Sequence, residues 1–190
     1  MINEYNNYPQ IENNKPKNAF LKNGKWYVSD HITYSEIACS CSHRYGRRQC
    51  AEVDWSQIIH PYILKSFEDE RAEKNKKYPG PIIINSGCRC LNHQEDLKRE
   101  GYDTSSGHST HCPIFNTKTG RWECYAIDKL IPVVNRKTMS PDLFFSLITS
   151  IHPELRLGFK IYGKTLVHED CAFLYEGPNK SSNWVTGARW

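Results

Sequence analysis

The sequence contains no long apolar run. No stretch of its 190 residues is apolar enough to span a membrane, so we expect no membrane span. Residues 1–25 are polar and lack the apolar core of a signal peptide. We therefore expect the protein to be made in the cytoplasm without a signal peptide.

Dense positive charge is also missing. The formal net charge is only +4, and residues 44–48 form its one basic segment of note. A dedicated nucleic-acid-binding domain should carry a clustered basic face. We therefore expect no nucleic-acid partner, and a cysteine-rich zinc module that binds nucleic acid is the least favoured alternative. A mild positive charge would suit an anionic polymer such as a bacterial cell wall.

Cysteine, in contrast, is abundant, with eight residues in the chain. Disulfides, a structural metal site and free thiols are all open, because cysteine pairing cannot be deduced from sequence alone. No cysteine lies in a recognisable protease signature, so we do not expect a cysteine nucleophile. The eight positions are Cys39, Cys41, Cys50, Cys88, Cys90, Cys112, Cys124 and Cys171.

Helical and strand patterns follow one another irregularly. Hydrophobic residues make up 38% of the chain, which is enough for one core. Residues 1–24, rich in Asn, Lys and Pro, are predicted to form a tail or wrapping arm ahead of one domain at 25–190. Without regular βαβ alternation, the pattern predicts a small α+β domain with a mainly antiparallel sheet and flanking helices. The predicted helices are 34–38, 55–77 with a break at Pro61, 91–100 and one starting at Ser140; the predicted strands are 25–28, 82–85, 122–130, 159–162 and 165–170.

Some of these segments also have a predicted environment. The charge run at 68–77 indicates a solvated helix end, and the basic segment at 44–48 indicates an exposed loop. The β-branched run at 82–85 indicates a buried strand. The last two predicted strands would form a hairpin around Gly163.

Four short motifs occur along the chain in this order: Ile84-Asn85-Ser86-Gly87-Cys88-Arg89-Cys90, Ser109-Thr110-His111, Ala126-Ile127-Asp128 and Val167-His168-Glu169-Asp170. In that order they resemble the zinc D-Ala-D-Ala carboxypeptidase and LD-endopeptidase family, many of whose members are encoded by bacteriophages. The family pattern is an SGYR-like strand end, S-x-H, G-x-A-x-D and a late His, often as H-x-D. The resemblance spans roughly residues 34–190 and implies a zinc site on the sheet.

The resemblance implies that His111, Asp128 and His168 are zinc ligands. Three protein ligands leave a fourth coordination position for water, which is the arrangement of catalytic zinc sites. Bound zinc lowers the pKa of water to about 7, so this set suits hydrolysis near neutral pH. His108 competes with His111 for the ligand role, and the S-x-H pattern favours His111.

Other residues near the motifs are assigned catalytic or binding roles. In a strand, His168 and Asp170 point to the same face, so Asp170 is the predicted general base or orienting partner, while Glu169 points away. By resemblance, Arg89 binds substrate or stabilises an oxyanion, with a structural ion pair as the alternative. Ser109 would orient substrate or a metal ligand, or else cap a turn.

The chain departs from the family pattern at one place above all. His111 and Asp128 lie 17 residues apart, whereas the family separates them by about seven, so residues 112–124 are predicted to be an inserted loop. Cys124 stands where the family has Gly, and Cys88 where it has Tyr. Each doubling of loop length adds only about 0.6 kcal/mol to the free-energy cost of closing the loop, so an insertion is tolerable. A disulfide between Cys112 and Cys124 would close the loop and add on the order of 3 kcal/mol in an oxidising environment.

The remaining cysteines offer a second site. Cys39, Cys41, Cys50 and Cys90 could form a closed structural zinc site, since four thiolates hold zinc well. Disulfides from the first cluster to Cys88 or Cys90 are the alternative.

Together these features predict a zinc-dependent peptidase that cuts peptide stems of peptidoglycan. It would be a D-Ala-D-Ala carboxypeptidase or an L-Ala-D-Glu type endopeptidase, active as a monomer on the bacterial cell wall. A phage endolysin or virion-associated enzyme would fit. The alternative is a non-enzymatic zinc-binding structural or wall-binding module on the same scaffold.

Overall fold

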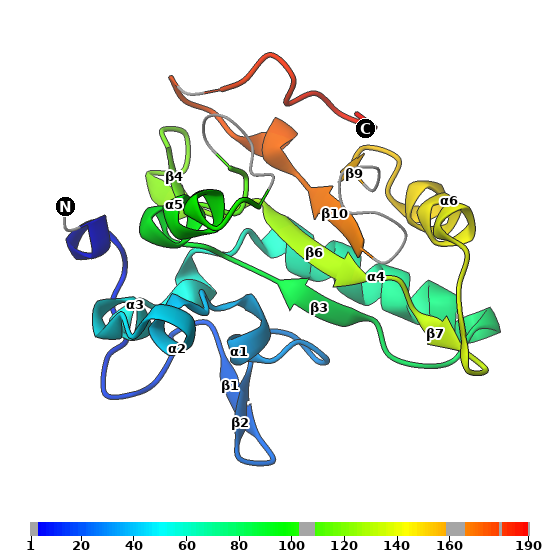
Figure 1. The fold of residues 1–190 in the computed structure, drawn as a ribbon, viewed down its shortest axis with the longest axis horizontal. Helices are drawn as coiled ribbons and strands as arrows, with labels where there is room; N and C mark the ends of the chain where they lie inside the picture. Colours follow the sequence, from blue (N-terminus) through cyan, green and yellow to red (C-terminus); the bar gives the residue numbers. More distant parts are fainter. Residues whose placement is uncertain (1–3, 103–108, 159–165, 179, 190) are drawn as a thin grey trace.

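A four-stranded antiparallel sheet forms the centre of the molecule (Figure 1). The computed structural model describes residues 4–102, 109–158, 166–178 and 180–189. Every neighbouring pair in the sheet is antiparallel. The strand order is β3-β6-β10-β9, with β3 at Ile83–Ser86, β6 at Ala126–Leu130, β10 at Leu166–Asp170 and β9 at Arg156–Gly158.

Strand β3 lies at an edge of the sheet, which corrects the prediction of a buried strand. Ile84 is buried, but Ile83 is 49% exposed. Side chains along this β-branched run therefore alternate between the core and solvent. The register shifts between Ile84 and Ser86, so the strand ends irregularly beside β6.

Helix α4 (Pro61–Lys77) packs behind the sheet (Figure 1). His60 caps its start by accepting the amide of Tyr62 at 3.2 Å, and Pro61 occupies the first turn. The predicted break at Pro61 is therefore confirmed, and the helix starts anew there. The preceding segment is a separate 3-10 helix, η2 (Trp55–Gln57), which Asp54 caps by accepting the amide of Ser56.

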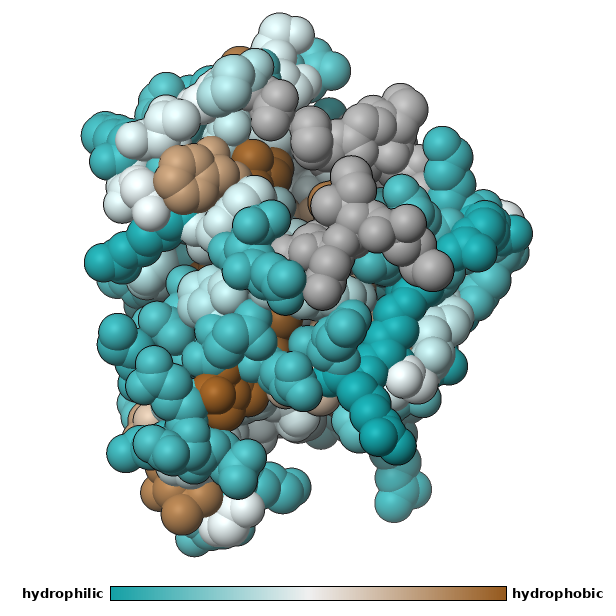
Figure 2. Space-filling view, turned by 90° about the vertical axis from the view of Figure 1, so that its left-hand side faces the viewer, coloured by the Kyte–Doolittle hydropathy of each residue, from teal (hydrophilic) through white to brown (hydrophobic). Residues whose placement is uncertain are grey.

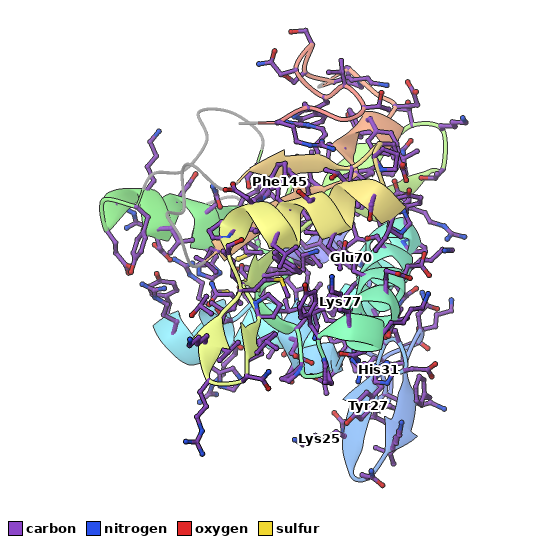
Figure 3. All side chains as sticks on the ribbon, turned by 90° about the vertical axis from the view of Figure 1, so that its right-hand side faces the viewer. Lys25, Tyr27, His31, Glu70, Lys77 and Phe145 are labelled. Atoms are coloured by element: carbon purple, nitrogen blue, oxygen red, sulfur yellow. The ribbon has the colours of Figure 1, made fainter. Side chains whose placement is uncertain are left out.

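The end of α4 is not fully solvated, in contrast to the prediction from its charge run. Glu70 and Lys74 are both fully buried, and Glu70 points into the body of the molecule (Figure 3). They continue the helical stripe begun by Ile63 and Phe67, at spacings of one helical face. Lys74 Nζ donates to the carbonyls of Tyr78 and Gly80 and so satisfies the helix end.

Two further helices form at their predicted positions. Helix α6 (Pro141–Ile151) begins at Ser140, whose Oγ accepts the amide of Leu143 at 3.2 Å. Helix α5 (Leu91–Arg99) is capped by the Cys90 side chain and is followed by Gly101 at a φ of +83°.

The N-terminal part packs beside one end of the sheet. Tyr5 and Tyr8 are buried in the core, and the Ile11 amide donates to the Glu52 carbonyl, so this arm wraps the domain. The hairpin β1–β2 extends away from the body (Figure 3). The elements of this N-terminal part are η1 (Glu4–Asn7), β1 (Phe20–Lys22), β2 (Lys25–Tyr27), α1 (Tyr34–Ile37), α2 (Cys41–Tyr45) and α3 (Arg48–Glu52).

Residues 44–48 are largely exposed, as predicted, but they do not form one loop. They span the end of α2 and the start of α3 around Gly46, which has a φ of +67°. Arg47 pairs with Asp96 of α5 at 2.5 Å, and Arg44 pairs with Glu100. The basic segment therefore fastens α2 and α3 to α5.

The strand predicted at 122–130 is divided in two. Its first part belongs to a hairpin, β4 (Ile114–Asn116) with β5 (Arg121–Glu123), and only the second part, β6, enters the main sheet. This hairpin occupies the predicted inserted loop. A second small hairpin pairs β7 (Val133–Val134) with β8 (Lys137–Thr138), and η3 (Ala172–Leu174) follows β10.

The predicted α+β class with an antiparallel sheet and flanking helices is confirmed. Strand β10 lies within the predicted strand 165–170 and pairs with β9, whereas the predicted strand 159–162 and the turn at Gly163 lie outside the described residues. Within the described part of the chain, no helix combines the length and apolar character needed to cross a bilayer. One face is mostly hydrophilic with small apolar patches (Figure 2).

Candidate metal centre

Three side chains from three segments converge on one point. The distances are 3.1 Å from His111 Nε2 to Asp128 Oδ1, 2.9 Å from His168 Nδ1 to the same oxygen, and 3.1 Å between the two ring nitrogens. All three residues are buried. The structure therefore brings together the set that the motif resemblance implies, as a group able to hold a metal ion.

The sheet and one turn explain this convergence. Asp128 on β6 is the direct register partner of His168 on β10, so their side chains lie on the same face. His111 comes from a turn in which the Cys112 amide donates to the Ser109 carbonyl. Hydrogen bonds hold the turn on both sides: the Tyr125 amide donates to the Thr110 carbonyl, and the Arg89 amide donates to the His111 carbonyl.

The hydrogen bonds at His111 fix which ring nitrogen is free. His111 Nδ1 lies 2.7 Å from the carbonyl oxygen of Gly87. A carbonyl only accepts, so Nδ1 carries the hydrogen and Nε2 presents its lone pair to the cluster. Gly87 thus selects the tautomer that a metal requires.

Asp170 holds the far ring nitrogen of His168, as Gly87 holds that of His111. Its Oδ2 lies 3.0 Å from His168 Nε2, and its Oδ1 accepts the amide of Ala172 at 3.0 Å. Nε2 also lies 3.4 Å from Thr110 Oγ1. Both oxygens of Asp170 are engaged away from the ligand triangle, so its contacts favour the orienting role over the predicted role of general base.

The electrostatics of the cluster call for a cation. Burial and the nearby charge of Arg89 lower the pKa of His111, so this ring is neutral. Burial would raise the pKa of Asp128, but the two histidines outweigh it and hold that pKa well below its usual range. Burial lowers the pKa of His168, yet Asp128 and Asp170 together raise it to about 9.

This charge pattern tests the fit to a metal. Two lone-pair nitrogens and one carboxylate oxygen within 3.1 Å repel one another unless they share a positive charge. A proton on His168 supplies that charge, and a divalent ion would supply more of it. Tetrahedral zinc with bonds of about 2.0–2.1 Å separates its ligand atoms by about 3.3–3.4 Å, close to the observed triangle. The donor set therefore fits zinc with only a small expansion.

Arg89 lies beside the ligands and pairs with one of them. Its Nη2 is 2.6 Å from Asp128 Oδ2, and its Nε donates to Ser86 Oγ at 3.0 Å. The side chain is 12% exposed, compared with 3% for Asp128. The ion pair that was the alternative reading of Arg89 is therefore present, and it leaves a cation at the rim of the cluster.

Ser109 has a local role in this structure. Its Oγ accepts the amide of His111 at 3.3 Å, which stabilises the turn that carries the ligand. The competitor His108 lies outside the described residues.

Glu169 points to the opposite face of the sheet, as the strand alternation predicts. It is fully buried, pairs with Lys129, and accepts a hydrogen bond from Ser66 at 2.8 Å. Lys129 also pairs with Glu70 of α4, and its Nζ lies 5.6 Å from the ring centroid of Phe144. This buried charge cluster of Lys129, Glu70 and Glu169 fastens α4 to the back of strands β6 and β10.

All eight cysteines are described, and all are buried thiols outside any disulfide. Cys112 and Cys124 are therefore not joined by the bond considered for the inserted loop. Cys124 Sγ instead donates to the carbonyl of His111 at 3.2 Å. Cys39, Cys41, Cys50 and Cys90 form a second group able to hold a metal ion, and Cys88 is not among them.

Two contributions to the centre were not predicted. The carbonyl of Gly87 is a backbone group, so no residue type in the sequence marks its contact with His111, although the glycine itself stands in the first motif. Lys129 follows a ligand directly in sequence, and its burial is visible only once α4 is placed behind the sheet.

The comparisons with protein-family models, with curated proteins and with solved structures found no match.

Proposed function

We propose that the protein is a zinc-dependent peptidase that hydrolyses the peptide stems of bacterial peptidoglycan. The observation that carries the proposal is the buried triangle of His111, Asp128 and His168, whose donor atoms lie 2.9–3.1 Å apart. Three protein ligands are typical of catalytic rather than structural zinc. Bound zinc supplies a Lewis acid that lowers the pKa of water to about 7 and polarises a carbonyl.

The chain's own residues hold this centre in one geometry. Gly87 and Asp170 each engage the far nitrogen of a ligand histidine, so both rings are locked before any metal binds. Arg89 neutralises one oxygen of Asp128. Its guanidinium is also suited to attract a substrate carboxylate or a developing oxyanion at the rim.

The choice of substrate rests on the motif resemblance. The order of the four motifs points to a D-Ala-D-Ala carboxypeptidase or an L-Ala-D-Glu type endopeptidase. We place its action on the bacterial cell wall, as a phage endolysin or a virion-associated enzyme working as a monomer.

One observation favours a second candidate, a non-enzymatic zinc module on the same scaffold. The two acids beside His168 are both engaged: Asp170 holds the ring, and Glu169 is buried behind the sheet. Neither is free to accept a proton from water. A structural or wall-binding role would need no such acceptor.

Digestion of purified bacterial cell walls separates the two candidates. We expect the zinc-loaded protein to release peptides or free D-Ala, identified by mass spectrometry, and a chelator to stop the release. His111→Ala should lose both zinc and activity. His31→Ala is the matched control, because this exposed histidine pairs with Glu68 at the surface. If His111→Ala digests walls as fast as the wild type, the peptidase proposal is wrong.

A further inference from the structure

A second cluster lies apart from the His–Asp triangle, where the N-terminal helices meet α5. Its four sulfur ligands come from four places in the chain: Cys39 after α1, Cys41 at the start of α2, Cys50 in α3 and Cys90 at the cap of α5. Their Sγ atoms all lie within 4.8 Å of one another. We propose that these four cysteines bind a structural zinc ion, separate from the proposed catalytic one.

The sulfur separations distinguish metal binding from disulfides. Cys90 Sγ lies 3.4 Å from Cys41 Sγ and 3.8 Å from Cys39 Sγ. A disulfide requires about 2.05 Å. Four thiolates around zinc, with bonds of about 2.3 Å, stand about 3.8 Å apart at the edges of a tetrahedron. One sulfur in contact with two others at such distances matches a shared ion and no single pairing.

Hydrogen-bond donors surround the sulfurs. The amide of Cys90 donates to Cys39 Sγ at 3.4 Å, and the amide of His93 donates to Cys90 Sγ at 3.3 Å. His93 Nδ1 lies 3.2 Å from Cys39 Sγ, and the Tyr5 hydroxyl lies 3.4 Å from Cys90 Sγ. Thiolates on zinc carry negative charge, and donors of this kind stabilise it.

The cluster is closed to solvent, which marks it as structural. Cys41, Cys50 and Cys90 are fully buried, and Cys39 is 5% exposed. Four sulfurs complete a tetrahedral shell and leave no position for water or substrate. Binding converts four thiols to thiolates and releases their protons, so the net charge of the occupied site is −2. Arg47, which interacts electrostatically with Cys41, offsets part of that charge.

The position of the cluster explains what the ion would do. It would join α1, α2 and α3, which are all short helices, to α5. Short helices are marginal on their own, and a metal that binds only the folded form stabilises them directly. Cys90 also follows Arg89, so the ion would fix the backbone from which Arg89 reaches Asp128.

Cobalt substitution tests the proposal independently of any enzymatic activity. Thiolate ligands give cobalt(II) an intense sulfur-to-metal charge-transfer absorption, which a His–Asp site lacks. We expect two metal ions per wild-type chain and a strong thiolate absorption. Cys90→Ser should lose the absorption and one ion, whereas His111→Ala should keep the absorption and lose the other ion. Cys171→Ser, a buried cysteine outside the cluster, should change neither.

The wild-type protein provides a measurement that does not depend on a folded variant. Zinc X-ray absorption should show a sulfur shell at about 2.3 Å beside a nitrogen and oxygen shell. A spectrum with nitrogen and oxygen ligands alone would overturn the proposal, as would persistence of the thiolate absorption in Cys90→Ser. Failure of the peptidase proposal would leave the sulfur shell in place, so the two proposals fail separately.

Discussion

Asp170 holds the nitrogen of His168 that faces away from the ligand triangle, with Oδ2 3.0 Å from Nε2. The opposite ring nitrogen, Nδ1, is the one that approaches Asp128. The imidazole therefore bridges Asp170 and the ligand cluster. Such a carboxylate sets the orientation of a ligand histidine and raises its basicity. Its loss should weaken the site although no ligand is removed.

We expect Asp170→Asn to lower zinc affinity by about 10- to 100-fold, the usual cost of removing such a partner. Competition with a chromophoric chelator measures the change. Asp142→Asn, at the start of α6, is the control. Affinity equal to that of the wild type would show that Asp170 does not support the ligand. A loss of wall digestion at saturating zinc would instead restore Asp170 as a proton acceptor.

The alternation of β10 was enough to predict how its acids are divided. Placing His168 and Asp170 on one face and Glu169 on the other requires only the period of a strand. The same holds for the starts of α4 and α6, where Pro61 and Ser140 act locally. Local rules of this kind produced the correct fold class.

Tertiary context decided what the sequence left open or misplaced. The acidic and basic residues at the end of α4 have the composition of a solvated helix. Only tertiary contacts bury Glu70, which pairs with Lys129 of β6, and Lys74, which donates to the carbonyls of Tyr78 and Gly80. Likewise, Ile83 is as apolar as Ile84, but its place on an edge strand exposes it. Which cysteines share a site is also a question of distance between remote segments.

Metal binding should depend on pH through His168. Without metal its pKa is about 9, above the ordinary value of 6.5. The proton therefore stabilises the metal-free fold fully below pH 6.5, and this contribution is lost as the pH rises through 9. Zinc must displace that proton from Nδ1, so its affinity should rise by about tenfold per pH unit below pH 9.

Calorimetry in buffers of different ionisation enthalpy measures the released proton. The Cys41→Ser variant, which should lack the sulfur site, isolates the His–Asp centre. We expect Asp170→Asn to move the break in the pH dependence to lower pH, since it removes one of the two carboxylates that raise the His168 pKa. An affinity independent of pH between 6.5 and 9 would contradict this account.

The buried charge cluster of Lys129, Glu70 and Glu169 should respond unequally to substitution. Burial and repulsion from Glu169 raise the pKa of Glu70. Burial would raise the pKa of Glu169, but Lys129 outweighs it and lowers that pKa. These opposite directions assign the retained proton to Glu70 and the negative charge that neutralises Lys129 to Glu169. Lys129→Met should cost about 3–5 kcal/mol because it leaves a buried carboxylate without its cation.

Glu70→Gln keeps the shape and the neutral state of that acid, so it should cost only about 1 kcal/mol. Urea unfolding at neutral pH compares the two variants. Equal losses would mean that Glu70 is ionised and that the charge assignment within the cluster is wrong.

Gly87→Ala should disturb the centre from a position that contributes no side chain. A methyl group there would lie 2.5, 2.6 and 2.8 Å from backbone atoms of Ile37, which is too close to be tolerated. Ile37 also accepts the amide of Cys88 at 2.8 Å, so relief must separate α1 from the end of β3. That movement displaces the Gly87 carbonyl from His111 Nδ1, and we expect zinc affinity to fall by at least about tenfold. The control is Gly120→Ala, which lies in open space at a φ of +66° and should cost about 1–2 kcal/mol of stability but leave zinc affinity unchanged.

If Gly87→Ala binds zinc as tightly as the wild type and the control do, the Gly87 carbonyl does not control the tautomer of His111.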